Sequence, residues 1–201
     1  MLDFISMKDL KQIENFLALL HEVQRVKRVS RRPDEKEVTN TAEHTFEVVM
    51  LSWYIISAEK LTLNLGLVLK YALVHDLVEA YAGDTFIGDT EAQKGKKERE
   101  AQALSRIEKE FPELEDLTQT IHEYEIRFTP EARFVYAVDK LVDPLSASME
   151  KTNSIWKELG MSLETILAYK QEKINQSEHV VPYWNALITK LTDNKKFFFD
   201  S

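Results

Sequence analysis

The chain has 201 residues, 44% of them hydrophobic, with 26 basic and 34 acidic side chains. The resulting net charge of -8 argues against a general nucleic-acid binder, because phosphate backbones attract positive protein surfaces. The chain has no cysteine, so disulfides, iron–sulfur clusters and thiol nucleophiles are excluded, and any metal has to be held by His, Asp and Glu.

Helix-forming residues dominate the composition. Five glycines and five prolines are too few for the turns of a many-stranded sandwich or barrel, and long stretches are rich in Ala, Leu, Glu and Lys. We therefore expect an all-α fold, organised as a single domain over residues 1–201. Charged residues break every long apolar run, and Asp3 interrupts the N-terminal one, which predicts neither a membrane span nor a secretory signal and favours a cytoplasmic location.

In the first half of the chain, apolar spacing predicts three helices. The first covers residues 8–24 and ends in the basic run RVKRVSRR. Residues 31–40 are polar and predict a loop, after which Thr41 can cap a helix that begins with EHTFEVVML. Residues 65–82 are apolar nearly all round, so we expect a central, buried helix that Gly83 stops.

The second half reads as further helices with short joints. The expected elements are a loop over 83–95, a charged helix over 96–110, a segment over 114–128, an apolar helix over 132–142 capped by Thr129, weaker helices around 162–175 and 180–192, and an aromatic tail over 197–199. Pro144 is expected to bend or end the helix before it.

Four side chains that can bind metal interrupt these apolar patterns. His75 and Asp76 lie in the most hydrophobic segment, Asp139 lies in ARFVYAVDKLV, and His44 lies on an apolar side of its helix. Burying an ionised carboxylate without a partner is strongly unfavourable. Each residue alone is compatible with an ordinary hydrogen-bonded core position, but one divalent cation at their centre would satisfy all four together.

The order H…HD…D resembles the HD-domain superfamily of metal-dependent phosphohydrolases. The segments NTAEHTFEV, LVHDLVEAYAGD and TPEARFVYAVDKL are similar to its subgroup of YfbR-like and HDDC2-like 5′-nucleotidases. The resemblance covers about residues 14–145 and leaves helices over 146–201. It implies an HD-domain helical bundle, usually a homodimer, that releases phosphate from nucleoside monophosphates. The metal ligands it implies are His44, His75, Asp76 and Asp139.

The same resemblance assigns catalytic roles. It makes Glu79 and Asp84 catalytic or substrate-positioning carboxylates and Arg25 a phosphate contact. Helical spacing agrees, because His75, Asp76 and Glu79 point to roughly one side of a helix. Glu79 would then lie beside the metal as a general base or proton donor, and Asp84, on a loop, could orient a substrate hydroxyl or the leaving group.

The sequence leaves open which arginine contacts the phosphate and which metal is bound. Arg25 is followed by Val26, where YfbR-like proteins commonly carry a bulky aromatic residue near the sugar, so selectivity for deoxyribose over ribose is not predicted. The loop that follows is also longer and more charged than in the subgroup, so Arg28, Arg31 or Arg32 could contact phosphate instead. Two imidazoles and two carboxylates suit one ion of Mn, Co, Fe, Ni or Zn without choosing among them.

These features predict an enzyme for small nucleotides, with no nucleic-acid or membrane partner. One alternative is another HD phosphohydrolase activity, on phosphodiesters or guanosine polyphosphates. A second is a nucleotide-sensing module without catalysis, and a third is a structural helical interaction protein. Glu79 and Asp84 favour catalysis, because a sensor needs neither.

Overall fold

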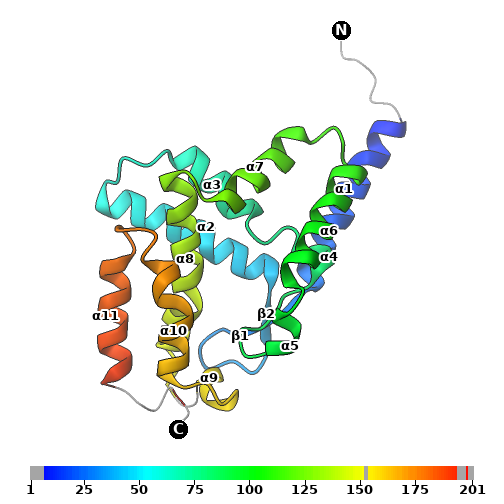
Figure 1. The fold of residues 1–201 in the computed structure, drawn as a ribbon. Helices are drawn as coiled ribbons and strands as arrows, with labels where there is room; N and C mark the ends of the chain where they lie inside the picture. Colours follow the sequence, from blue (N-terminus) through cyan, green and yellow to red (C-terminus); the bar gives the residue numbers. More distant parts are fainter. Residues whose placement is uncertain (1–6, 152–153, 194–197, 199–201) are drawn as a thin grey trace.

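The computed structural model describes residues 7–151, 154–193 and 198, and it is built almost entirely of helices (Figure 1). In chain order the elements are α1 (Met7–Arg25), β1 (Lys27–Arg31), β2 (Val38–Asn40), α2 (Thr41–Glu59), α3 (Leu65–Val74), α4 (Glu79–Ala82), α5 (Thr90–Gln93), α6 (Lys96–Glu110), α7 (Glu115–Ile126), α8 (Pro130–Ala147), α9 (Ile155–Glu158), α10 (Leu163–Ile174) and α11 (Val181–Thr192). The all-α prediction is confirmed, as are the longer helices, whereas the short helices α5 and α9 were not expected.

Two apolar cores organise the described helices. The larger core joins α2, α3, α7, α8, α10 and α11, and Figure 1 shows α8, α10 and α11 side by side. The smaller core joins α1, α4, α6 and α7. Tyr71 and Ala72 belong to the larger core, whereas Leu77 and Val78 belong to the smaller one, so the segment between them lies where the two cores meet.

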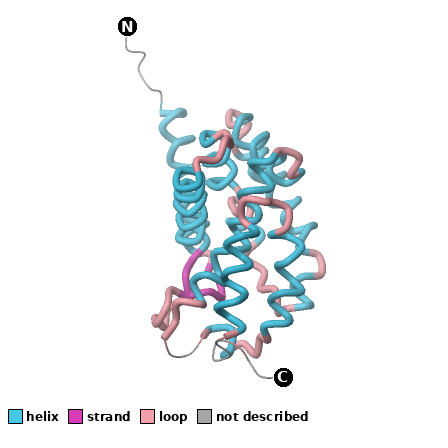
Figure 2. The backbone as a smooth tube through the Cα atoms, turned by 90° about the vertical axis from the view of Figure 1, so that its left-hand side faces the viewer, coloured by secondary structure: helices cyan, strands magenta, loops and turns pink. Residues whose placement is uncertain are grey.

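A two-stranded hairpin takes up both ends of the loop expected over 31–40, and residues 32–37 form its turn. Strand β1 pairs antiparallel with β2, and both strands are magenta in Figure 2. In this pairing Lys27 lies opposite Asn40. The Thr39 hydroxyl donates to the Ser30 carbonyl at 3.1 Å, which adds a cross-strand bond. The loop prediction was wrong for the strand residues because pairing across the hairpin, which local polarity does not reveal, decides their conformation.

The helix predicted over 65–82 is interrupted. Helix α3 ends at Val74, and α4 begins only at Glu79. The His75 ring Nδ1 lies 2.8 Å from the Ala72 carbonyl and donates to it, so a side chain satisfies a carbonyl of the last turn of α3. The next backbone bonds span three residues, as from the Glu79 amide to the Asp76 carbonyl at 3.0 Å, which tightens the turn. The prediction of one continuous helix was therefore wrong at the point where the polar residues occur.

Pro144 was expected to bend or end its helix, but α8 continues past it to Ala147, so the expectation of a helix end was wrong, and a bend at Pro144 stays a prediction. Proline has no amide hydrogen and leaves the carbonyl four residues earlier without its helical partner. The Lys170 ammonium of α10 donates to that carbonyl, on Lys140, at 3.1 Å. A lysine of α10 thus supplies the hydrogen bond that Pro144 cannot donate within α8.

The C-terminal part covers the larger core. Phe198 stacks on Trp156 with ring centroids 5.6 Å apart, while residues 197 and 199 of the expected aromatic tail lie outside the described residues. The single domain over residues 1–201 stays a prediction. Within the described ranges, every helix is too short or too polar to cross a membrane.

Candidate metal centre and active site

The start of α2 places His44. The Asn40 side chain accepts a hydrogen bond from the Glu43 amide, and the Glu43 carboxylate accepts one from the Asn40 amide, each at 3.0 Å. This reciprocal cap satisfies two amides at the helix start. Asn40, not the predicted Thr41, is therefore the N-cap, and His44 in the first turn is only 1% exposed.

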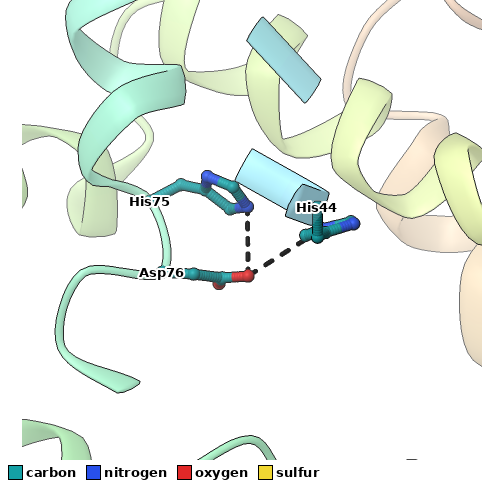
Figure 3. Close-up of side chains that lie close together, drawn as sticks. All are labelled: His44, His75 and Asp76. Atoms are coloured by element: carbon teal, nitrogen blue, oxygen red, sulfur yellow. Dashed lines mark ion pairs between the residues drawn. The ribbon is translucent and has the colours of Figure 1, made fainter. Parts of the chain in front are cut away.

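His44, His75 and Asp76 form a cluster with the chemistry of a metal centre. Figure 3 shows the two imidazoles facing the Asp76 carboxylate, and the possible ligand atoms of these three residues lie within 4.8 Å of one another. Asp76 Oδ2 is 3.1 Å from His75 Nε2 and 3.8 Å from His44 Nε2. Asp139 Oδ1 is 3.0 Å from His44 Nε2. The four predicted ligands thus come together from α2, the turn after α3, and α8.

The atoms present fit a divalent cation. His75 donates through Nδ1 to the Ala72 carbonyl, so its Nε2 is presented to the cluster, where it is buried and makes no hydrogen bond. Metal-binding histidines commonly use this arrangement, in which one ring nitrogen donates to the protein and the other binds the ion. Two imidazoles with carboxylates suit several first-row transition metals.

The protonation states of His75 and Asp139 are also compatible with a bound cation. Although burial acts to lower it, the Asp76 carboxylate raises the pKa of His75 to about 9. Burial acts to raise the pKa of Asp139, but Lys140 and His44 hold it well below its usual range. The cluster therefore holds two carboxylates and a protonated imidazole, a charge pattern in which a dication can take the place of the proton.

Arg28 lies at the centre of the carboxylates. From β1 its guanidinium places Nη1 3.1 Å from Asp76 Oδ2 and 3.9 Å from both Glu79 Oε2 and Asp84 Oδ1. Its Nη2 lies 3.7 Å from Asp143 Oδ2. The hairpin therefore delivers one arginine of the basic run into the interior, next to the metal cluster.

The other arginines of this run lie elsewhere. Arg25 is 66% exposed in its side chain and pairs with Glu22 of its own helix. Arg31 pairs with Glu158 at 2.8 Å, and Arg32 pairs with glutamates of the hairpin turn and of α2. Of the phosphate contacts considered, the structure brings only Arg28 to the metal cluster, and Arg25 does not join it.

Glu79 and Asp84 line the same space. Glu79, the first residue of α4, is 3% exposed, and its Oε2 accepts a hydrogen bond from the Thr41 hydroxyl at 2.9 Å. Burial and the nearby Asp76 raise its pKa to about 8, against the opposing charge of Arg28. Burial also raises the pKa of Asp84. Glu79 therefore exchanges its proton near neutral pH, as a general acid–base group requires.

Two adjoining cavities of about 60 Å³ each meet at Arg28. The first is polar, and its charged lining residues are Arg28, Asp76, Glu79, Asp84, Lys96, Asp139, Lys140, Asp143 and Lys170. The second shares Arg28, Asp84, Asp143 and Lys170 but has an apolar wall of Val29, Phe86, Ile87, Ile155, Trp156 and Leu159. A separate open groove of about 680 Å³ between α1, α4 and α6 is lined by none of the predicted site residues.

Several site residues were not found from the sequence. Asp143 follows Asp139 by four residues, which places it one turn further along the same face of α8, so spacing alone could have found it. Lys96 and Lys170 had no such signal, because α6 and α10 reach the cavity only through tertiary packing. Thr41 was expected to cap a helix but instead holds Glu79.

Known proteins share this architecture. The HD domain family model matches residues 20–181. The 5′-deoxynucleotidase HDDC2 of Xenopus laevis is 28% identical over 138 residues, which are 65% of this chain and 65% of that protein. The Homo sapiens protein of the same name is 29% identical over 143 residues, 69% of this chain and 68% of that protein. The chain thus spans about two thirds of the length of these relatives.

A solved structure agrees over nearly the whole chain. The crystal structure of a predicted metal-dependent phosphohydrolase from Magnetospirillum magnetotacticum matches with a TM-score of 0.82 and 25% identity, covering 97% of this chain and 100% of that one. The PH0347 protein from Pyrococcus horikoshii matches with a TM-score of 0.64 at 25% identity. The resemblance seen in the sequence is confirmed by both kinds of comparison.

Proposed function

Because this chain belongs to the HD domain family, we propose that it is a metal-dependent phosphohydrolase that releases phosphate from nucleoside 5′-monophosphates. The observation that carries the proposal is the metal-ligand cluster at one end of a cavity whose walls also hold Arg28, Glu79 and Asp84. The names of the 5′-deoxynucleotidase relatives support the substrate class.

The ligand set provides one part of the chemistry. A divalent cation held by His44, His75, Asp76 and Asp139 would polarise the phosphoryl group and lower the pKa of water. Arg28 is placed to bind phosphoryl oxygens, because its planar guanidinium can donate two parallel hydrogen bonds to such a group. In this role it would exchange part of its contact with the carboxylates for the substrate.

Glu79 provides the proton transfer. Its Oε2 is fixed by the Thr41 hydroxyl, and its pKa of about 8 lets it take a proton from the attacking water and return it to the leaving 5′ oxygen. Asp84 lines both cavities, so it can accept a hydrogen bond from a sugar hydroxyl or orient the leaving group.

The lining of the second cavity matches the nucleoside end of the substrate in chemistry, and its volume of about 60 Å³ requires the cavity to widen when substrate binds. Its wall includes the rings of Phe86 and Trp156, and it shares Arg28, Asp84 and Asp143 with the charged cavity. Apolar and aromatic walls with a few polar groups are typical of small-molecule sites. A substrate with a charged phosphate and a flat, partly apolar base matches a charged cavity next to an apolar one.

Phosphate release from a panel of ribo- and deoxyribonucleoside monophosphates, with Mn, Co, Fe, Ni or Zn added in turn, tests the proposal. We expect metal-dependent release of phosphate from at least one monophosphate. Cleavage of phosphodiesters or guanosine polyphosphates alone would assign another HD phosphohydrolase activity. Nucleotide binding without phosphate release under any of these metals would favour the sensing alternative.

The positions of the two arginines make a further prediction. Replacing Arg28 with lysine is expected to lower kcat/KM about ten- to a hundredfold, because lysine cannot reproduce a bidentate guanidinium contact. The matched change at Arg25 is expected to leave kcat/KM within about twofold, because exposed charge pairs contribute little. Steady-state kinetics on both variants measures this. A larger loss at Arg25 than at Arg28 would restore the assignment made from the resemblance.

We also propose that the protein forms a homodimer through α1. That helix carries an exposed apolar seam of Leu10, Ile13, Leu17 and Leu20, beside the face that it buries in the smaller core. The alternating spacing of three and four residues is typical of helices that pack lengthwise on a second helix. Light scattering on the purified protein measures its mass directly, and a monomer at micromolar concentration contradicts the proposal.

A cytoplasmic location stays a prediction of the sequence.

A further inference from the structure

The charged cavity holds four cations, and three of them are held by fixed partners. Arg28 contacts Asp76 at 3.1 Å, and the Lys140 ammonium lies 2.5 Å from Asp139 Oδ2. Lys170 is buried and donates to the Lys140 carbonyl at 3.1 Å. In the protein without substrate, these three cations balance carboxylates or complete the backbone bonding of α8.

Lys96 is held differently. It is the first residue of α6, and its ammonium lies 3.4 Å from Glu100 one turn further along the same helix. Both side chains are more than a quarter exposed, and ion pairs of this type are weak and easily exchanged. Lys96 also lies at the positive end of the α6 macrodipole, which favours an anion at the same place.

The surroundings keep Lys96 charged. Burial lowers its pKa and Lys140 acts in the same direction, but Glu100, Glu79 and Asp76 raise it overall. The carboxylates of the active site therefore act on Lys96 across the cavity that it lines. Lys96 is thus a protonated, weakly paired cation in the cavity that holds the metal cluster.

The charge balance of the cavity is compatible with a role for such a cation in binding phosphate. Its lining holds five carboxylates, Asp76, Glu79, Asp84, Asp139 and Asp143, against four cations, Arg28, Lys96, Lys140 and Lys170. A divalent cation would be balanced by its two carboxylate ligands, Asp76 and Asp139, and a phosphomonoester then brings close to two further negative charges at neutral pH. Arg28 has four of these carboxylates within 3.1 to 3.9 Å, so its charge is shared among them.

We propose that Lys96 exchanges Glu100 for a phosphoryl oxygen of the bound substrate and acts as a catalytic residue that stabilises the charge of the phosphoryl group. The inference rests on the proposed phosphohydrolase function and adds a second phosphate contact, from α6, to that of Arg28 on the hairpin. In the protein without substrate, Glu100 holds Lys96 within reach of the cavity.

Four variants test this contact: Lys96→Met, Lys96→Arg, Glu100→Gln and, as a matched control, Lys97→Met, which removes an exposed lysine from the same helical turn. Titration with inorganic phosphate gives the affinity, nucleotide hydrolysis gives kcat and KM, and elemental analysis gives the metal content. Lys96→Met is expected to weaken phosphate binding and lower kcat/KM about ten- to a hundredfold, with the metal retained. Lys96→Arg should keep most of the affinity.

The Glu100 variant separates substrate contact from a structural role. If Lys96 binds phosphate, Glu100→Gln leaves the affinity unchanged or tighter, because it releases the competing carboxylate. If the pair only stabilises α6, Glu100→Gln and Lys96→Met weaken phosphate binding equally, and the proposal is overturned. An effect of Lys96→Met no larger than that of Lys97→Met overturns it as well. Because inorganic phosphate is titrated directly, this result stands apart from whether wild-type protein hydrolyses nucleotides.

Discussion

Replacing His75 with alanine is expected to empty the metal centre and reduce phosphate release to the background of the assay. His75 Nε2 is buried without a hydrogen bond and lies 3.1 Å from Asp76 Oδ2, so alanine removes a ligand atom from the middle of the cluster. Elemental analysis of the purified variant measures the loss of metal. Asp139→Ala should give the same result, because its carboxylate faces His44 in the same cluster.

The loss of metal should also appear in thermal stability. A ligand present at about 100 times its dissociation constant stabilises the folded state by about 2.7 kcal/mol. Wild-type protein should therefore melt several degrees lower after chelation, whereas His75→Ala should melt at the same temperature with and without chelator. His122→Ala is the control, because His122 pairs with Glu108 on the exposed surface. Full metal content in His75→Ala would contradict the ligand assignment.

The sequence predicts the helices because their apolar spacing is local information. Residues 96–110 coincide with α6, and 162–175 with α10 to within one residue at each end. The breaks are less predictable, since they depend on contacts made after folding. The turn at His75 uses a ring-to-carbonyl bond, and the helix past Pro144 uses a lysine from α10. Neither partner is visible in the local pattern.

The metal cluster was predictable for a related reason. Polar residues in apolar helix faces need partners, so their positions in the sequence already indicate a shared centre. The sequence did not predict which arginine of the basic run contacts phosphate, because the run folds into a hairpin that sends its arginines in different directions. Arg25 ends α1 in solvent, and Arg28, three residues later, enters the interior from β1. Only the pairing of the two strands determines which arginine does so.

Replacing Glu79 with glutamine is expected to lower kcat about a hundred- to ten-thousandfold, the usual contribution of a general acid–base group. The amide oxygen of glutamine can still accept the hydrogen bond from the Thr41 hydroxyl, so the fold and the cavity should be kept. The variant cannot exchange a proton near neutral pH, which the carboxyl group can because burial and Asp76 raise its pKa to about 8.

The decisive measurement compares Glu79→Gln with Asp84→Asn under the same conditions. Both carboxylates line the charged cavity, and burial raises the pKa of both. If Glu79 transfers the proton, its variant loses kcat with metal content and phosphate affinity near those of wild type, while Asp84→Asn changes KM more than kcat. The reverse pattern would assign proton transfer to Asp84. Loss of metal in Glu79→Gln would make Glu79 itself a ligand, because a residue that only moves protons leaves the metal centre filled.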